Sequence, residues 1–150
     1  MKLTIQQDIH ITENEIIIKC AHMDARLQKL ADYIRQFSFS LEGIKEGQSY
    51  QIPLDRILYI DTVDRSTFLY EEDTSYESRM SLISLEQLLQ NTTFVRISKN
   101  CILNTEFLKC VEPYPNHRLK ATLRNGEHLL IARNYISNVK EKLSQGRMQP

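Results

Sequence analysis

The chain has 150 residues, of which 41% are hydrophobic, and its 19 Lys and Arg residues balance 19 Asp and Glu residues. This length predicts one domain, or one domain with a small extension, with enough apolar residues for a packed core. Because no signal peptide or membrane-spanning run is evident, we expect a cytoplasmic protein. Cys20, Cys101 and Cys110 show no metal-type spacing, and we expect reduced, buried thiols.

The net charge of zero hides a segregation of charge along the chain. Residues 1–45 are neutral, with six basic and six acidic residues. Residues 46–94 carry three basic and nine acidic residues, whereas residues 95–150 carry ten basic and four acidic ones. This asymmetry predicts a positively charged face supplied by the last third of the chain. The alternative is that the acidic and basic segments pair with each other across a sheet.

Residues 1–46 predict a small β-β-α-β extension. Residues 3–5 alternate apolar and polar side chains, and residues 15–20 form an Ile-rich strand candidate. Residues 23–37 place their apolar side chains at helical spacing, and residues 38–41 alternate again. A unit of this size is too small to hold a core alone. We therefore expect it to dimerise, to bind a partner or to pack against the rest of the chain.

Residues 47–145 predict a second unit, which is mainly β with short helices. A capping box favours a helix that begins at Ser84, and Asn134 is a candidate cap for a last helix. Asn125 and Gly126 form the strongest hairpin signal, because both turn positions need positive φ. We expect residues 146–150 to be a frayed tail. The expected strands lie within residues 52–61, 67–70, 75–79, 94–98, 107–111, 119–123 and 127–132.

The most informative stretch is residues 94–104, Phe-Val-Arg-Ile-Ser-Lys-Asn-Cys-Ile-Leu-Asn. It begins with strand alternation and then leaves strand register. Ser98 is a candidate cap for a short helical turn, which the apolar residues 101–103 would anchor to a core. The stretch would then present cationic and hydrogen-bonding groups to a polyanion, and the alternative is a strand end with solvated polar residues. The presented residues would be Arg96, Ser98, Lys99 and Asn100.

Catalytic and metal-binding patterns find little support in the sequence. Four glycines are too few for a glycine-rich phosphate cradle, and the four histidines show no metal-ligand spacing. The densest carboxylates, in residues 71–73, are typical of a solvated loop. We therefore expect no enzymatic activity, no cofactor and no metal site.

Four blocks of the sequence resemble the LytTR family of bacterial DNA-binding domains. They are residues 57–61, 85–89, 94–104 and 125–135, and they occur in the family's order. The most specific part is Phe-x-Arg-Ile, then six further residues and Asn, then Asn-Gly and then Arg-x-Tyr. The resemblance implies antiparallel β-sheets sandwiched around an elongated core. It also implies that loops, rather than a recognition helix, enter two successive major grooves of double-stranded DNA and contact the minor groove between them.

Three loop regions make these contacts in the family. Some relatives carry His in the first loop and Asn at the position of Lys99, and this chain departs from them with Thr67 and Lys99. From the residues alone, Arg133 precedes a helix terminus that attracts phosphate, although it could instead pair with Glu127 or Glu141. Arg96 and Asn104 could equally be structural. The resemblance implies DNA contacts by Arg65, Ser66, Thr67, Ser98, Lys99, Asn100, Arg133 and Asn134.

The residues that precede these blocks are too few for the receiver domain that many family members carry. We therefore expect a stand-alone transcription regulator, joined into a homodimer mainly through residues 1–46. Some stand-alone members accompany small membrane proteins, which makes such a protein a further candidate partner. The alternative function is a protein-interaction module whose basic face binds an acidic partner. Sequence-dependent binding of duplex DNA would distinguish the two.

Overall fold

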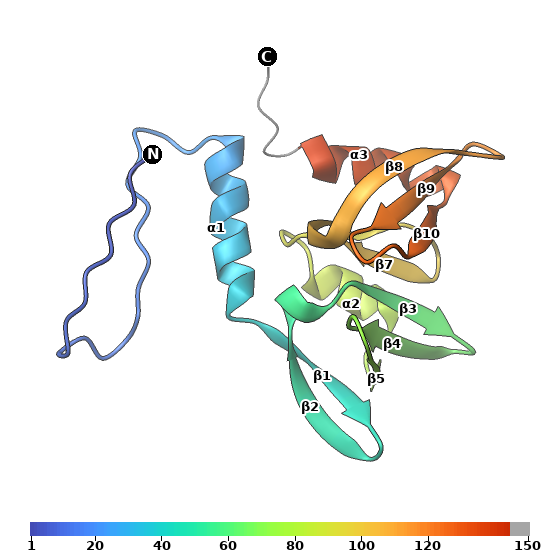
Figure 1. The fold of residues 1–150 in the computed structure, drawn as a ribbon, viewed down its shortest axis with the longest axis horizontal. Helices are drawn as coiled ribbons and strands as arrows, with labels where there is room; N and C mark the ends of the chain where they lie inside the picture. Colours follow the sequence, from blue (N-terminus) through green and yellow to red (C-terminus); the bar gives the residue numbers. More distant parts are fainter. Residues whose placement is uncertain (145–150) are drawn as a thin grey trace.

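Two antiparallel β-sheets, one of seven strands and one of three, form the body of the molecule in this computed structural model, which describes residues 1–144 (Figure 1). The expected mainly β fold of antiparallel sheets with short helices is confirmed. The expected tail at residues 146–150 lies outside the described residues. The helices are α1 (Ala25–Phe37), α2 (Leu82–Leu88) and α3 (Ile136–Ser144), and the short 3-10 turns are η1 (Leu54–Arg56), η2 (Thr105–Phe107) and η3 (Arg133–Tyr135).

The seven-stranded sheet has the strand order β2-β1-β5-β4-β3-β7-β6. Residues 101–103, which we expected in a helical turn, form β7 instead. Their backbone groups pair with both β3 and β6, and a helical turn would leave β6 without a partner and β3 with β4 alone. The strands of this sheet are β1 (Ser40–Lys45), β2 (Gln48–Pro53), β3 (Tyr59–Val63), β4 (Ser66–Tyr70), β5 (Ser75–Ser78), β6 (Phe94–Arg96) and β7 (Cys101–Asn104).

The three-stranded sheet is a meander of β8 (Leu108–Tyr114), β9 (Arg118–Leu123) and β10 (His128–Ile131). The hairpin expected at Asn125 and Gly126 is confirmed. Of the two turn residues, however, only Gly126 has a positive φ, of 93°. The amide of Leu123 donates to the carbonyl of Glu127 at 2.8 Å, which closes a three-residue loop rather than a two-residue turn.

Helix α2 begins three residues earlier than the sequence pattern suggested. Ser81 caps it, and its Oγ accepts a hydrogen bond from the amide of Ser84 at 3.1 Å. The cap expected at Ser84 is therefore wrong. The earlier start brings Leu82 into the first turn, where this side chain is buried beside Leu85 in the core.

Two hydrophobic clusters fill the body, and the β6–β7 hairpin belongs to both. The first joins α2, through Leu85, to the seven-stranded sheet, and the second joins α3, through Val139, to the three-stranded sheet. Along β7, Ile102 belongs to the first cluster and Leu103 to the second. Both faces of this strand are therefore buried, which explains why its apolar residues do not alternate with polar ones.

The amino-terminal region differs most from the expectation. Residues 1–24 contain no helix or strand, so the strands expected at residues 3–5 and 15–20 are absent. Neither stretch lies beside another strand with which its amides and carbonyls could pair. The expected helix is present as α1, capped by Asp24, whose Oδ1 accepts from the amide of Leu27 at 2.8 Å.

The expected boundary between residues 46 and 47 falls inside the turn of the β1–β2 hairpin. All six residues of β1 pair with β2, and Ile44 also pairs with Glu77 of β5. β1 is therefore part of the seven-stranded sheet, and the segment outside the body is residues 1–39.

The three cysteines are free thiols in different surroundings. Cys101 is buried, as expected, and burial raises the pKa of its thiol above the usual range. Cys20 and Cys110 are exposed, so the expectation of three buried thiols is wrong for them. Cys20 lies in the amino-terminal segment and Cys110 lies on the edge strand β8, and neither place is covered by another element.

Candidate nucleic-acid interface

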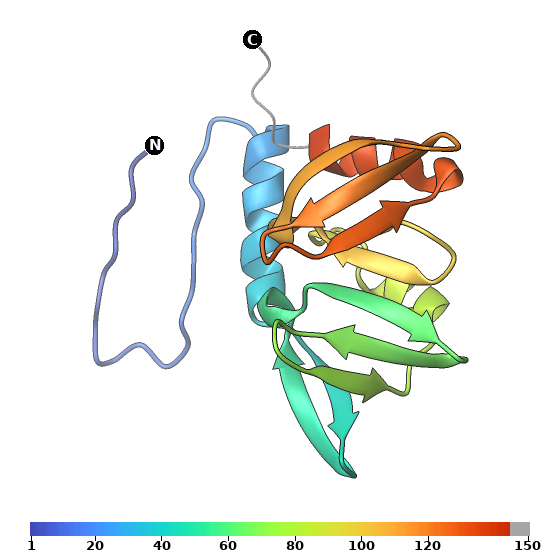
Figure 2. The same cartoon turned by 45° about the vertical axis from the view of Figure 1, so that its right-hand side comes forward.

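The three segments expected to contact DNA lie together at one end of the molecule. They are the β3–β4 turn with the strand ends beside it (residues 62–67), the β6–β7 loop (97–100) and the connection from β10 into η3 (132–135), and we call them the contact end. All three lie on the right-hand side in Figures 1 and 2, away from α1. The amide of Thr62 donates to the carbonyl of Asn100 at 2.8 Å, and the amide of Ala132 donates to that of Ile97 at 2.9 Å. Backbone hydrogen bonds therefore join each segment to the next.

In the first segment the turn places Arg65 outside the sheet. Asp64 and Arg65 have positive φ values of 50° and 68°, and both side chains are exposed. Ser66 is half-buried at the start of β4. Thr67 is only 6% exposed, and its Oγ1 lies 3.5 Å from that of Thr62. Arg65 is thus free to meet a ligand, whereas the Thr67 hydroxyl lies inside the sheet.

In the second segment a tight bend presents Lys99 and Asn100. The carbonyl of Cys101 accepts the amides of Ile97, at 3.0 Å, and Ser98, at 3.4 Å. The Oγ of Ser98 accepts the amide of Asn100 at 3.2 Å, so Ser98 organises the bend rather than capping a helix. Ser98 is half-buried, and the side chains of Lys99 and Asn100 are exposed.

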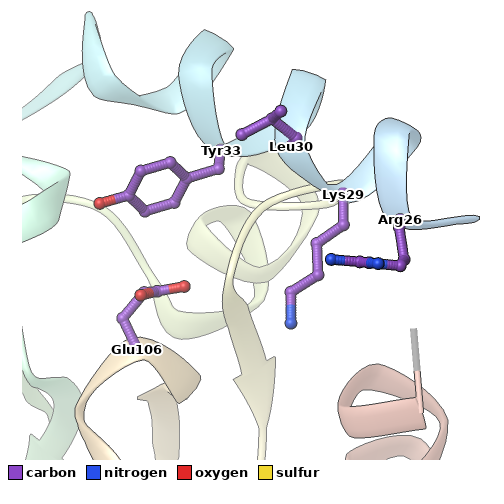
Figure 3. A pocket seen from close by; sticks show the side chains of 5 residues that line it. All are labelled: Arg26, Lys29, Leu30, Tyr33 and Glu106. Carbon is purple, nitrogen blue, oxygen red and sulfur yellow. The ribbon is translucent and has the colours of Figure 1, made fainter. Parts of the chain in front are cut away.

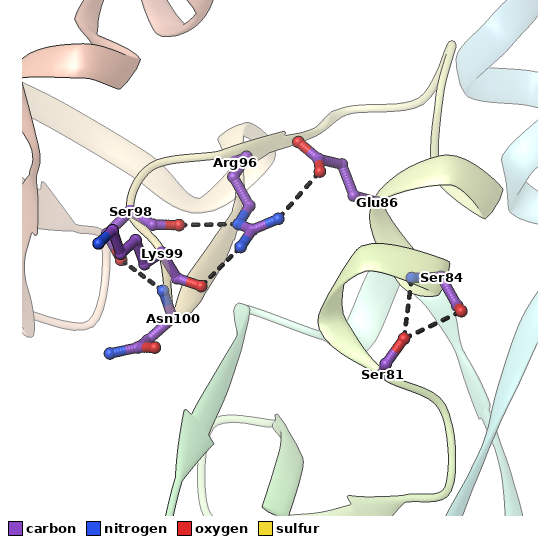
Figure 4. Close-up of polar contacts among 7 residues, drawn as sticks. All are labelled: Ser81, Ser84, Glu86, Arg96, Ser98, Lys99 and Asn100. Carbon is purple, nitrogen blue, oxygen red and sulfur yellow. Dashed lines mark hydrogen bonds and ion pairs between the residues drawn. The ribbon is translucent and has the colours of Figure 1, made fainter. Parts of the chain in front are cut away.

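Arg96 lies beneath this bend instead of joining the presented residues (Figure 4). Its side chain is only 12% exposed. The guanidinium donates to two consecutive loop carbonyls, from Nε to Ser98 at 2.7 Å and from Nη2 to Lys99 at 2.6 Å. Nη1 forms an ion pair with Glu86 of α2 at 2.9 Å. Of the two interpretations of Arg96, the structural one therefore fits, because the loop itself uses its donors.

In the third segment Arg133 and Asn134 lie in η3, and both are exposed. Asn134 lies inside η3, which runs directly into α3, so it does not cap the last helix as expected; the residue before η3 is Ala132, which makes no side-chain cap. Within residues 1–144, Arg133 forms no ion pair with Glu127 or Glu141. Its guanidinium therefore remains available at the contact end.

The segregated charges pair with each other very little. The described residues form four ion pairs, and only Arg96–Glu86 joins the acidic segment to the basic one. Arg65, Lys99 and Arg133 belong to none of them. The contact end therefore keeps three exposed cations with no carboxylate partner among residues 1–144.

Asp61 is an acidic group close to the contact end. It is half-buried on β3, opposite Cys101 of β7. Burial raises the pKa of this carboxyl, and a hydrogen bond from the amide of Thr62 partly offsets that effect. The ionised form of this carboxyl is therefore less favoured in the folded protein than in water.

A fourth segment on the same side escaped the sequence reasoning. The β8–β9 turn (residues 115–117) lies beside the contact end in Figures 1 and 2. Asn116 and His117 have positive φ, and the Nε of Arg118 donates to the carbonyl of Pro115 at 3.0 Å. The sequence marked this stretch only as a turn. The basic character of the last third was the one signal that could have pointed to it.

Asn104, the last residue of the motif, is fully buried. Its Nδ2 donates to the carbonyl of Ile57 at 2.8 Å, and its Oδ1 accepts from Thr93 Oγ1 at 2.6 Å. Thr93 in turn exchanges two hydrogen bonds with the amide side chain of Gln36, the one buried residue of α1. We call Gln36, Thr93, Asn104 and the Ile57 carbonyl the interior network. Asn104 therefore has a structural role.

Cations that lie exposed and unpaired on neighbouring loops, on one side of a β-sheet protein, are typical of a nucleic-acid-binding domain. Residues 47–144 match the family model of the LytTr DNA-binding domain. Since this match covers well over half of the chain, the protein belongs to this family of DNA-binding domains. The resemblance found in the sequence is confirmed.

The relatives differ in how much of their length they share with this chain. The sensory transduction protein LytT of Enterococcus faecalis is 28% identical over 98 residues, which are 65% of this chain and 40% of that protein. An uncharacterized HTH-type transcriptional regulator of Staphylococcus aureus is 23% identical over 146 residues, which are 96% of this chain and 99% of that protein. The chain therefore spans less than half of the first relative and nearly all of the second.

A solved structure supports the fold. The LytTr DNA-binding domain of a Bacillus cereus protein superposes with a TM-score of 0.66 at 21% identity, over 71% of this chain and 97% of that one. Within the part of the chain that the structure describes, no helix is long and apolar enough to cross a membrane.

Proposed function

We propose that this protein regulates transcription by binding double-stranded DNA at specific sequences through its contact end. The observation that carries the proposal is the gathering of Arg65, Lys99 and Arg133, exposed and unpaired within the described residues, on three segments that backbone hydrogen bonds join. Transcription control is what the name of the Staphylococcus aureus relative states, and that relative shares nearly the full length of this chain.

The side chains at the contact end suit different parts of a duplex. A free guanidinium such as that of Arg133 can donate two hydrogen bonds to the major-groove edge of guanine. The amide of Asn100 has the donor and acceptor that match adenine, and Lys99 is a point charge suited to phosphate. Because the three segments lie side by side rather than on one helix, we propose that they enter successive major grooves as loops.

A selection experiment tests the proposal directly. The purified full-length protein is incubated with a pool of random duplexes, and the bound fraction is sequenced. We expect enrichment of a defined site, which the protein then binds at least about a thousandfold more tightly than an unrelated duplex of equal length. Weak and equal binding of all duplexes would instead favour a module whose basic face binds an acidic protein.

We also propose that two copies of the chain bind DNA together. The observation that favours a dimer is the distribution of exposed large apolar side chains, of which 11 of 18 lie within residues 1–39. Leu30 and Phe37, seven residues apart, lie on the same exposed side of α1, and Phe37 is 60% exposed. Apolar side chains gathered in this way mark interaction surfaces, and the charge of residues 1–45 is balanced, so two copies would not repel each other.

α1 also borders an open pocket, which is lined by Arg26, Lys29, Leu30 and Tyr33 of this helix and by Glu106 of η2 (Figure 3). This placement leaves Phe37 farther along the helix for a second copy. α1 lies away from the contact end in both Figures 1 and 2, so an interface there would leave the DNA-facing segments free.

Light scattering tests the dimer. At tens of micromolar the wild-type chain is expected to be a dimer, and the double variant Leu30→Glu with Phe37→Glu a monomer. The matched control is Ile83→Glu with Leu88→Glu, which changes two exposed apolar residues of α2 and should leave the dimer intact. A monomeric wild type, also in the presence of the selected duplex, would contradict the proposal.

A further inference from the structure

Arg96 connects three elements that meet beneath the contact end. Its planar guanidinium, whose N–H groups form a fork of donors, donates to the carbonyls of Ser98 and Lys99 and forms an ion pair with Glu86 of α2 (Figure 4). Its guanidinium carbon also lies 6.0 Å from the ring centroid of Tyr135, in the third segment. One side chain therefore contacts α2, the second segment and the third segment.

These contacts fix the part of the loop that carries the presented side chains. The carbonyls of Ser98 and Lys99 directly flank the Lys99 side chain and precede Asn100. If Arg96 did not hold them, water would solvate these carbonyls, and the loop could adopt other conformations at little cost. The cost to DNA recognition would be larger, because a base contact requires its donors at defined positions.

We infer that Arg96 is a positioning residue, whose hydrogen-bonding fork, rather than its charge, sets the sequence preference of the contact end by holding the second segment against the third. The inference rests on the proposed DNA-binding function. The charge of Arg96 is paired with Glu86 at 2.9 Å, and the side chain is nearly buried, so its charge is poorly placed to meet phosphate. Its three hydrogen bonds, in contrast, point in directions that only a planar guanidinium supplies.

The substitution Arg96→Lys separates the effect of the hydrogen-bonding fork from the effect of the positive charge. Lysine keeps the positive charge, but its ammonium lacks the rigid planar fork that spans two consecutive carbonyls and a carboxylate. The matched control is Arg79→Lys, because Arg79 also pairs with a glutamate, Glu42, at 3.6 Å, but its side chain is 77% exposed, and the carbonyls of Ser98 and Lys99 are held by Arg96 instead. Glu86→Gln is the second test variant, since it removes the carboxylate that holds the guanidinium.

Binding is measured against the duplex that the wild type selects and against an unrelated duplex of equal length, over a range of salt concentrations. For Arg96→Lys we expect the ratio of the two affinities to fall about tenfold, the range expected when one good base contact is lost. The slope of log affinity against log salt should stay the same, since the number of neutralised phosphates is unchanged. Glu86→Gln should lower the ratio by a smaller factor, and Arg79→Lys should leave it unchanged.

Two results would overturn the inference. An unchanged ratio in a folded Arg96→Lys variant would mean that Arg96 only fills space beneath the loop. Equal losses for both duplexes with a shallower salt slope would mean that Arg96 itself contacts phosphate. If Arg96→Lys fails to fold, Glu86→Gln decides, and an unchanged ratio in that variant overturns the inference. A wild type that prefers no sequence would instead refute the proposed function.

Discussion

The interior network and the contact end use the same kinds of polar side chain in opposite ways. Asn104 and Asn100 lie in one hairpin, four residues apart. Asn104 is fully buried, and its side-chain amide is hydrogen-bonded to the interior network and to the backbone amide of Glu106. Asn100 is exposed, and its side chain has no hydrogen-bond partner within residues 1–144.

The polar groups of the interior network therefore bond within the protein, whereas those of the contact end are free to bond to a ligand. A buried amide contributes to stability only when its groups are paired, because an unpaired buried polar group costs about 1–3 kcal/mol. An exposed amide contributes little to stability, but it can bind a ligand. We therefore expect substitutions in the interior network to change folding, and substitutions at the contact end to change DNA binding.

The largest expected effect is on stability. Asn104→Ala should lower the free energy of unfolding by about 2–5 kcal/mol, since it leaves the Ile57 carbonyl without its donor and the Thr93 hydroxyl without its acceptor and opens a cavity. Urea denaturation measures the change. The control, Asn100→Ala in the same hairpin, should stay within about 0.5 kcal/mol of the wild type. Equal stability of the two variants would remove the distinction between the two regions.

The next effect is on specific DNA binding. Arg133→Ala should weaken binding of the selected duplex by about 1–3 kcal/mol and relax the preference at one base position, without lowering the thermal midpoint. Fluorescence anisotropy and a repeated selection measure both changes. Arg56→Ala is the control, because Arg56 is an exposed arginine in η1, before β3, at the end of that strand opposite the contact end. A folded Arg133→Ala variant with unchanged affinity and preference would show that Arg133 is no base contact.

A smaller effect is expected from Lys99, because a phosphate contact is the same on every sequence. The slope of log affinity against log salt should be roughly −0.9 for each phosphate neutralised. Lys99→Ala should make the slope shallower by about one unit and weaken the selected and the unrelated duplex alike. Binding that does not respond to salt would mean that the basic last third does not face DNA.

The smallest effect concerns Asp61, which is half-buried between the two regions. Burial raises the pKa of its carboxyl in the folded state, so the folded protein holds this proton more tightly than the unfolded chain does. The wild type therefore loses stability as the pH rises from the unfolded pKa through the raised folded pKa. Asp61→Asn stays neutral and should raise the thermal midpoint at pH 7 by less than about 4 °C, with no rise near pH 3.

Asp73→Asn serves as its control. Asp73 is an exposed carboxylate in the β4–β5 loop, and its substitution should leave the midpoint unchanged at both pH values. A lower midpoint for Asp61→Asn at pH 7 would mean that the ionised carboxylate of Asp61 stabilises the fold.

Local signals in the sequence predicted much of the fold. The Asn125–Gly126 hairpin and helix α1 follow from turn chemistry and from apolar spacing, which are properties of neighbouring residues. β7 could not be predicted in this way, because its three consecutive apolar residues are buried on both faces, and only the assembled clusters reveal that. Residues 15–20 illustrate the reverse case, since strand propensity without a neighbouring strand produces no strand.

The candidate site was predicted in outline but not in detail. The family motif located the three segments, and the structure places them side by side. The motif could not show that the Thr67 side chain is buried, because strand alternation leaves open which face of the sheet is covered. Nor could it separate Arg96 from Lys99, since both are cations in the same stretch. Only the carbonyls around the guanidinium distinguish the two.

The hydrogen bonds between Gln36 and Thr93 have a consequence for the spacing of the DNA site. They tie α1 to the body through a buried pair of contacts, at 3.0 Å and 2.9 Å, so α1 is a rigid arm rather than a tether. In the proposed homodimer, two rigid arms would hold the two contact ends at one separation and one angle. The DNA site would then tolerate little change in the number of base pairs between its two half-sites. Insertion of about five base pairs would turn the second half-site to the opposite side of the duplex, beyond the reach of the partner copy.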